Sequence, residues 1–92
     1  MRAMSLRELV TVLDVDEAFV LELEAEELVY RDEQGLYSLE QAERVRVCWT
    51  MRAELGVNFE GVQVALHLLD RLLEERSRNR AVLERFKDRW QQ

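Results

Sequence analysis

The chain has 92 residues, of which 48% are hydrophobic and 35% charged, and its formal net charge at pH 7 is -6. This length allows one domain, or one small domain with a long helix, and the acidic balance argues against a generic nucleic-acid binder. The lack of proline and the presence of only three glycines make an all-β architecture a poor fit. One cysteine, Cys48, and one histidine exclude an internal disulfide and a zinc cluster. We therefore expect a protein with no enzymatic activity and no cofactor.

Two further expectations concern location and assembly. No apolar run approaches the roughly 18 residues of a membrane span, and the N-terminus lacks the long apolar region of a signal peptide. A cytoplasmic, reducing location is therefore expected, with no membrane partner. A core of this size is marginal, so the chain is expected to bind a partner or a second copy.

The charge is divided along the sequence. Residues 1–43 carry 12 acids and three arginines, whereas residues 44–92 carry seven acids and ten bases. Within 14–33, nine acids accompany Arg31 alone. Such an acidic segment attracts basic partners and repels phosphate backbones. The alternative is that these charges only solvate exposed helix faces.

The first predicted elements are two short helices. Ser5 and Glu8 form a capping-box pattern that opens a helix over about 6–13. Asp14 or Asp16 can cap a second helix over roughly 16–26. Two short helices with a brief joint predict a helix-turn-helix.

A β-hairpin and a third helix are predicted next. Short apolar and aromatic runs on both sides of Gly35 predict a small hairpin, or wing. Ser38 and Gln41 form a second capping-box pattern, which opens a helix over about 39–55. Gly56 lies just past its end, and Asn58 can cap the last helix.

The last predicted helix begins at Phe59 and extends to about residue 90, a length of roughly 48 Å. We therefore divide the chain into residues 1–58, a winged helix-turn-helix domain with a connecting helix, and residues 59–92, a dimerisation helix. From residue 62 onward, spacings of three and four alternate over four heptads, so the helix is expected to pair with a second copy. The residues assigned to this seam are Ala65, Leu69, Leu72, Arg76, Asn79, Leu83, Phe86 and Trp90.

An antiparallel pairing is predicted for this seam. In a parallel dimer Arg76 would face Arg76 of the second copy, which is repulsive. Antiparallel pairing places Arg76 opposite Asn79, and small Ala65 opposite large Trp90. The alternative is that residues 59–75 pack on the helix-turn-helix and 76–92 form a solvated tail. The basic residues of this tail could also touch nucleic acid, although acids interleave with them.

The layout as a whole resembles the MerR-type winged helix-turn-helix. Residues 51–70, MRAELGVNFEGVQVALHLLD, narrow the resemblance to the chaperone-modulator (CbpM-type) family of small MerR-related proteins. The resemblance implies a mainly α fold with a β-hairpin wing and a terminal antiparallel coiled coil. Residues 1–50 match this family only in the pattern of their predicted elements.

The resemblance also implies a function. Members of this family bind the J-domain of a DnaJ-like co-chaperone, such as curved-DNA-binding protein A, and block its use of the Hsp70 partner DnaK. Because the second helix offers carboxylates and no cation that could read bases, its surface suits a basic protein rather than a phosphate backbone. The expected partner contacts are Glu22, Glu26, Glu27, Tyr30 and Asp32. The alternatives are a MerR-like DNA-binding transcriptional regulator and a structural adaptor for some other basic partner.

Overall fold

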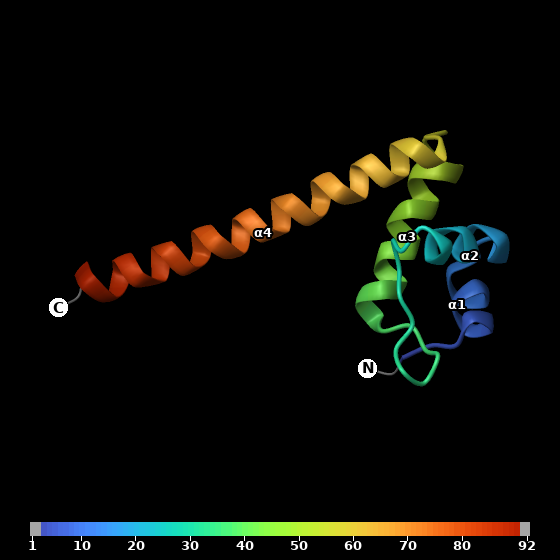
Figure 1. The fold of residues 1–92 in the computed structure, drawn as a ribbon, viewed down its shortest axis with the longest axis horizontal. Coiled ribbons are helices and arrows are strands. Elements are labelled where there is room, and N and C mark those ends of the chain that lie inside the picture. The colour runs from blue at the N-terminus through green and yellow to red at the C-terminus, as the bar shows by residue number, and fades with distance from the viewer. Residues whose placement is uncertain (1–2, 91–92) are drawn as a thin grey trace.

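The computed structural model describes residues 3–90, except for the side chain of Trp90. Its helices are α1 (Leu6–Leu13), α2 (Glu17–Ala25), α3 (Leu39–Ala53) and α4 (Phe59–Trp90). The first three helices and the start of α4 form a small body, and the rest of α4 projects from it as a rod (Figure 1). The mainly helical fold expected from the sequence is confirmed.

The predicted caps explain where the helices begin. Ser5 Oγ accepts a hydrogen bond from the Glu8 backbone N–H, and the Glu8 carboxylate accepts one from the Ser5 N–H, which completes the capping box of α1. Asp16 caps α2 by accepting from the Ala18 N–H. Ser38 caps α3 by accepting from the Gln41 N–H.

The core lies where α2, α3 and the first turns of α4 meet. Phe19 of α2 contacts Trp49 of α3 and Phe59 of α4 edge-on, with ring centroids 5.3 Å and 6.4 Å apart. Such pairs add to the stabilisation from apolar burial. The buried hydrophobic residues are Leu9, Val15, Phe19, Val20, Leu23, Val29, Tyr37, Ala42, Val45, Cys48, Val62 and Leu66. The core thus holds the second helix of the helix-turn-helix against α3.

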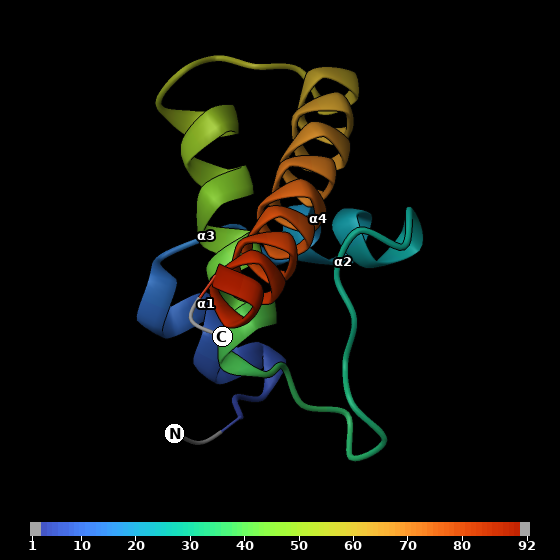
Figure 2. The same ribbon diagram turned by 90° about the vertical axis from the view of Figure 1, so that its left-hand side faces the viewer.

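The prediction of a β-hairpin wing is wrong. Residues 28–36 form a loop, and Tyr37 pairs instead with Met4 through two backbone hydrogen bonds of 2.7 and 2.8 Å. The Asp32 N–H donates to the Leu36 carbonyl at 2.7 Å, as in a hairpin turn, but other groups that a ladder needs have different partners. The Tyr30 N–H donates to Gln41 Oε1, and the Asp32 carboxylate accepts from the Leu36 N–H. The loop is visible beside α3 in Figure 2.

Helix α4 packs on the body only through its first turns. Val62 and Leu66 are buried, whereas every side chain from Arg71 to Arg89 is exposed. Of the predicted seam, Ala65 and Leu69 are half-buried at the edge of the body, and the side chain of Trp90 lies outside the described residues. The remaining seam residues, all exposed, are Leu72, Arg76, Asn79, Leu83 and Phe86. No helix within residues 3–90 is both long and apolar enough to cross a membrane.

Candidate partner-binding surface

The exposed face of α2 is acidic and apolar. Phe19, Val20 and Leu23 point into the core, which leaves Glu17 and Glu22 exposed beside Leu21 on the outer face. The sequence of this helix, EAFVLELEA, contains no cation. The outer face of α2 therefore presents carboxylates where a DNA-reading helix presents hydrogen-bond donors to base edges.

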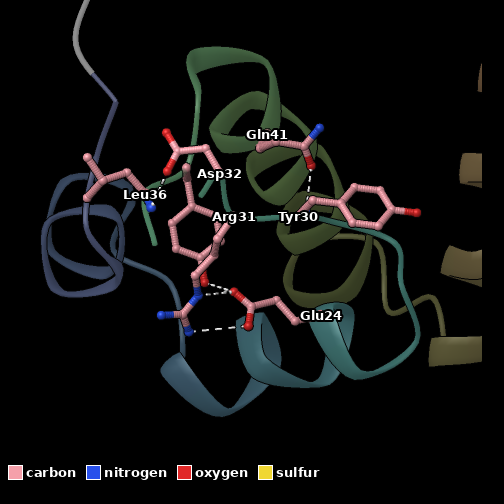
Figure 3. A network of polar contacts seen from close by, with 7 residues as sticks. Glu24, Tyr30, Arg31, Asp32, Leu36 and Gln41 are labelled. Atoms are coloured by element: carbon pink, nitrogen blue, oxygen red, sulfur yellow. Dashed lines mark hydrogen bonds and ion pairs between the residues drawn. The ribbon is translucent and has the colours of Figure 1, made fainter. Parts of the chain in front are cut away.

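A network joins the end of α2 to the loop that follows it (Figure 3). Arg31 donates to both carboxylate oxygens of Glu24, at 2.7 and 3.2 Å, and the Tyr37 hydroxyl also donates to Glu24. The guanidinium of Arg31 lies over the Tyr37 ring, 5.3 Å from its centroid. The hydrogen bonds to Glu24 raise the pKa of Arg31 above its ordinary value. The only cation of the acidic segment is thus already paired.

Three of the predicted contact residues keep exposed carboxylates. Glu22 lies on the outer face of α2, and Glu26 is the C-cap residue of that helix. Glu27 follows with a left-handed φ of 60°, which turns the chain away from the helix. Glu26 accepts one side-chain hydrogen bond, from Gln63 at 3.4 Å.

The other two predicted residues have different roles. Tyr30 is 58% exposed, and its ring points away from the Glu24 network in Figure 3. It is therefore available to a partner. Asp32 instead holds the loop together, because its Oδ1 accepts from the N–H groups of Gln34 and Leu36 at 2.9 and 3.0 Å. Asp32 thus has a structural role in the turn, and its contact with a partner stays a prediction.

Two of the predicted residues, Glu27 and Tyr30, border a groove of about 910 Å³ between α3, α4 and the loop after α2. We call it the elbow groove, because it lies in the angle where α4 leaves the body. Its lining consists of Glu27, Leu28, Tyr30, Leu39, Glu40, Gln41, Glu43, Arg44, Val47, Gln63, Leu66, His67, Leu69, Asp70 and Leu73. Glu22, Glu26 and Asp32 lie outside this lining. The structure therefore divides the predicted contact set between two surfaces.

An ion pair between α3 and α4 holds the elbow groove in shape. Arg44 donates to the two carboxylate oxygens of Asp70 at 2.6 and 3.4 Å, and its Nε donates to the Leu28 carbonyl at 3.1 Å. The Arg44 side chain is only 22% exposed. These bonds connect both helices to the loop. They also pair the charge of the Arg44 guanidinium with the Asp70 carboxylate.

Two carboxylates lie on the α3 side of the groove. Glu40 and Glu43 are exposed on the first turns of α3. The hydrogen bond from Arg46 lowers the pKa of Glu43 below its ordinary value. Together with Glu27 they place three carboxylates around an apolar interior, and that of Glu43 is paired with Arg46.

Sequence reasoning missed most of this groove. Leu39 and Leu73 carry no local signal that assigns them to a site. The pairing of Arg44 with Asp70 joins residues 26 positions apart, which only the crossing of α3 and α4 brings together. The charge spacing of Glu40 and Glu43 was a usable signal, since residues three apart share a helix face.

No group of His, Cys, Asp and Glu side chains within residues 3–90 could hold a metal ion. Comparison with family models gives a match over residues 4–84 to the MerR helix-turn-helix regulatory proteins. The chain belongs to the MerR helix-turn-helix family. The match extends from the residue before the α1 cap into the exposed half of α4, so the MerR assignment covers both the body and most of the rod. Comparisons with curated proteins and with solved structures give no match.

Within the MerR family assignment, α2 takes the place of the recognition helix. In helix-turn-helix proteins the second helix enters the major groove with its N-terminal residues on base edges. Here that end carries Asp16 and Glu17, and both are exposed. The scaffold is that of a regulator, whereas the charge of this surface is opposite to that of a DNA reader.

Proposed function

We propose that the protein is a non-enzymatic modulator that binds the J-domain of a DnaJ-like co-chaperone and blocks its interaction with DnaK. The observation that carries the proposal is the exposed recognition helix, which presents Glu17 and Glu22 and has no cation. J-domains present a basic helix to their Hsp70 partner. An acidic competitor attracts such a helix by complementary charge.

The resemblance of residues 51–70 to the chaperone modulators supports the same function. This segment contains Gly56, which has a left-handed φ of 66°, and Asn58, whose Oδ1 accepts from the Gly61 N–H at 2.8 Å. These residues end α3 and start α4, and so they set the angle at which α4 leaves the body. The part of the chain that carries the resemblance is therefore the part that shapes the elbow groove.

The protein acts as a homodimer through α4. Leu72 and Leu83 are 48% and 64% exposed on the projecting rod. Such side chains remain in contact with water unless a second helix covers them. The antiparallel register places Leu72 of one copy opposite Leu83 of the other, and Arg76 opposite Asn79.

The second candidate function is a MerR-like DNA-binding transcriptional regulator. Membership of the MerR family favours it, as does the group of cations on the rod that includes Arg78, Arg85 and Arg89. The acidic recognition helix opposes it, because carboxylates repel the phosphate backbone.

Calorimetric titration against an isolated J-domain tests the first function. We expect saturable binding that weakens as salt is raised, because charges further apart than about 8 Å are screened at physiological ionic strength. Titration with a mixed-sequence DNA duplex serves as the comparison. Tight duplex binding together with no heat from any J-domain of the same cell would reverse the order of the two functions.

A further inference from the structure

We propose that the partner docks in the elbow groove, and that the element it inserts there is a basic amphipathic helix. The proposal rests on the proposed function, since it names the surface that this function uses. It moves the main contact from the outer face of α2 to the angle between α3 and α4.

The apolar part of the argument comes from large side chains that border the groove yet remain exposed to solvent. Tyr30, Leu39 and Leu73 are 58%, 47% and 52% exposed, and they come from the loop, α3 and α4 respectively. The interior between them includes Leu66, which is buried. Exposed apolar side chains that converge on a concave surface typically mark a docking site, and a helix laid in a groove uses such contacts.

The charge of the groove lining determines which charge a bound partner must carry. Glu27 and Glu40 are exposed around the groove, and the third acid, Glu43, is paired with Arg46. The arginine of the lining, Arg44, is already bonded to Asp70 and to the Leu28 carbonyl. A helix with an apolar stripe flanked by lysines or arginines complements this arrangement, whereas a phosphate backbone is repelled by it.

The proposed dimer seam lies beside the groove and overlaps it at one residue. Leu69 belongs to the seam and also lines the groove. The rest of the two surfaces differs: at 100° per residue, Asp70 in the groove and Leu72 on the seam point about 160° apart around α4. Leu72 and Leu83 are exposed, and neither lines the groove. Self-association is therefore measured alongside partner binding in the experiment below.

The experiment compares two pairs of matched variants by calorimetric titration with an isolated J-domain at physiological salt. Glu40→Lys in the groove is matched by Glu60→Lys, since both residues are exposed acids in the first turn of a helix. Leu73→Ala is matched by Leu68→Ala, since both are exposed leucines of α4 and Leu68 lies outside the groove lining. We expect Glu40→Lys to raise Kd about tenfold and Leu73→Ala about fivefold, with changes under about twofold in the two controls.

Three results would overturn the proposal. If Glu60→Lys weakens binding as much as Glu40→Lys, binding follows the net charge of the chain, and the proposed function stands without the groove. If Glu40→Lys or Leu73→Ala changes self-association in sedimentation, the groove holds a second copy. If all four variants bind like the parent chain, the partner docks elsewhere. Thermal melts followed by circular dichroism confirm that each variant is folded.

A second probe tests the groove proposal independently of the proposed co-chaperone function. A fluorescent amphipathic peptide of lysine, leucine and alanine is titrated with the same four variants. Groove-dependent peptide binding without binding of any J-domain retains the groove and rejects the proposed function. Peptide binding that all variants share equally rejects the groove as a specific site.

Discussion

Glu24 shows how one residue can be removed from a binding surface by its neighbours. It lies on α2 among other acids, yet its carboxylate accepts from both Arg31 and the hydroxyl of buried Tyr37. These bonds compensate for placing the phenol inside the core, because a buried hydroxyl without a partner is costly. Glu24 therefore stabilises the fold, whereas Glu22, two residues earlier, remains available to solvent.

Replacing Tyr37 with Phe removes this hydroxyl and leaves the ring in place. We expect the free energy of unfolding to fall by about 1.5 kcal/mol, the usual effect of losing a hydrogen bond to a charged group. Urea denaturation measures the change. The control is Tyr30→Phe, whose ring is exposed and outside the network. An equal loss in the two variants would contradict the role given to the network.

Burial determines the chemistry of Cys48. The side chain is inaccessible in the core, and this desolvation raises the pKa of the thiol from 9.0 to about 11, although nearby Arg44 acts in the opposite direction. The folded state therefore holds the thiol proton more tightly than the unfolded state does. The protonated thiol contributes fully to the free energy of unfolding below pH 9, and this contribution is lost as the pH rises through about 11.

The alkylation rate of Cys48 is the corresponding measurement. At pH 8 we expect iodoacetamide to react with the native chain at least about 100-fold more slowly than with the chain unfolded in urea, since the thiolate is the nucleophile. The native rate should rise with pH up to about 11. Equal rates for the native and unfolded chain would show that the thiol is not enclosed in the core.

At the scale of elements, the junction between α3 and α4 fixes the geometry of the site. Asn58 Oδ1 accepts from the Gly61 N–H, and a Cβ on Gly61 would lie 2.6 Å from Val57 Cγ1. The residue at 61 must therefore be small for the cap and the preceding turn to fit together. The angle between α3 and α4 depends on this contact, and so does the shape of the elbow groove.

Asn58→Ala tests the cap. We expect the free energy of unfolding to fall by about 1 kcal/mol, the typical cost of losing an N-cap side chain. Asn58→Asp is the matched control, because aspartate keeps the acceptor and adds a negative charge at the helix start. Thermal denaturation followed by circular dichroism gives both values. Destabilisation by Asp equal to that by Ala would show that the side-chain bond does not start α4.

The helices were predictable from sequence because their signals are local. The Ser5 capping box and the Ser38 and Asn58 caps each act over a few residues, and they predict the observed starts of α1, α3 and α4. For α2 the sequence offered Asp14 or Asp16, and Asp16 is the cap. The loop over residues 28–36 was not predictable, because its backbone groups bond to partners outside a hairpin, such as Gln41. The elbow groove was not predictable either, since it arises only from the packing of α3 on α4.

At the scale of the whole molecule, the body and the rod are energetically separate. The last core residue along the chain is Leu66, and every described side chain after Asp70 is exposed. The second half of α4 therefore adds little to the stability of a single copy. Its apolar positions act only when another helix covers them.

Removing residues 76–92 tests this separation. We expect the shortened chain to keep a cooperative thermal transition and to sediment as a monomer, whereas the full chain sediments as a dimer at micromolar concentration. The melting temperature of the full chain should rise with protein concentration, because association stabilises the folded state. The temperature of the shortened chain should not. A shortened chain that remains dimeric would place the interface on the body.

The straightness of α4 has a consequence for how the molecule tumbles. The chain extends over 55 × 30 × 20 Å, and α4 crosses α3 at a wide angle in Figure 1. No glycine or proline follows Gly61, so the rod lacks the usual causes of a kink. Rotational diffusion is therefore anisotropic. The N–H bonds of α4 lie along the long axis, so only the slow end-over-end tumbling reorients them. We expect them to have a higher ratio of transverse to longitudinal nitrogen relaxation than those of α3.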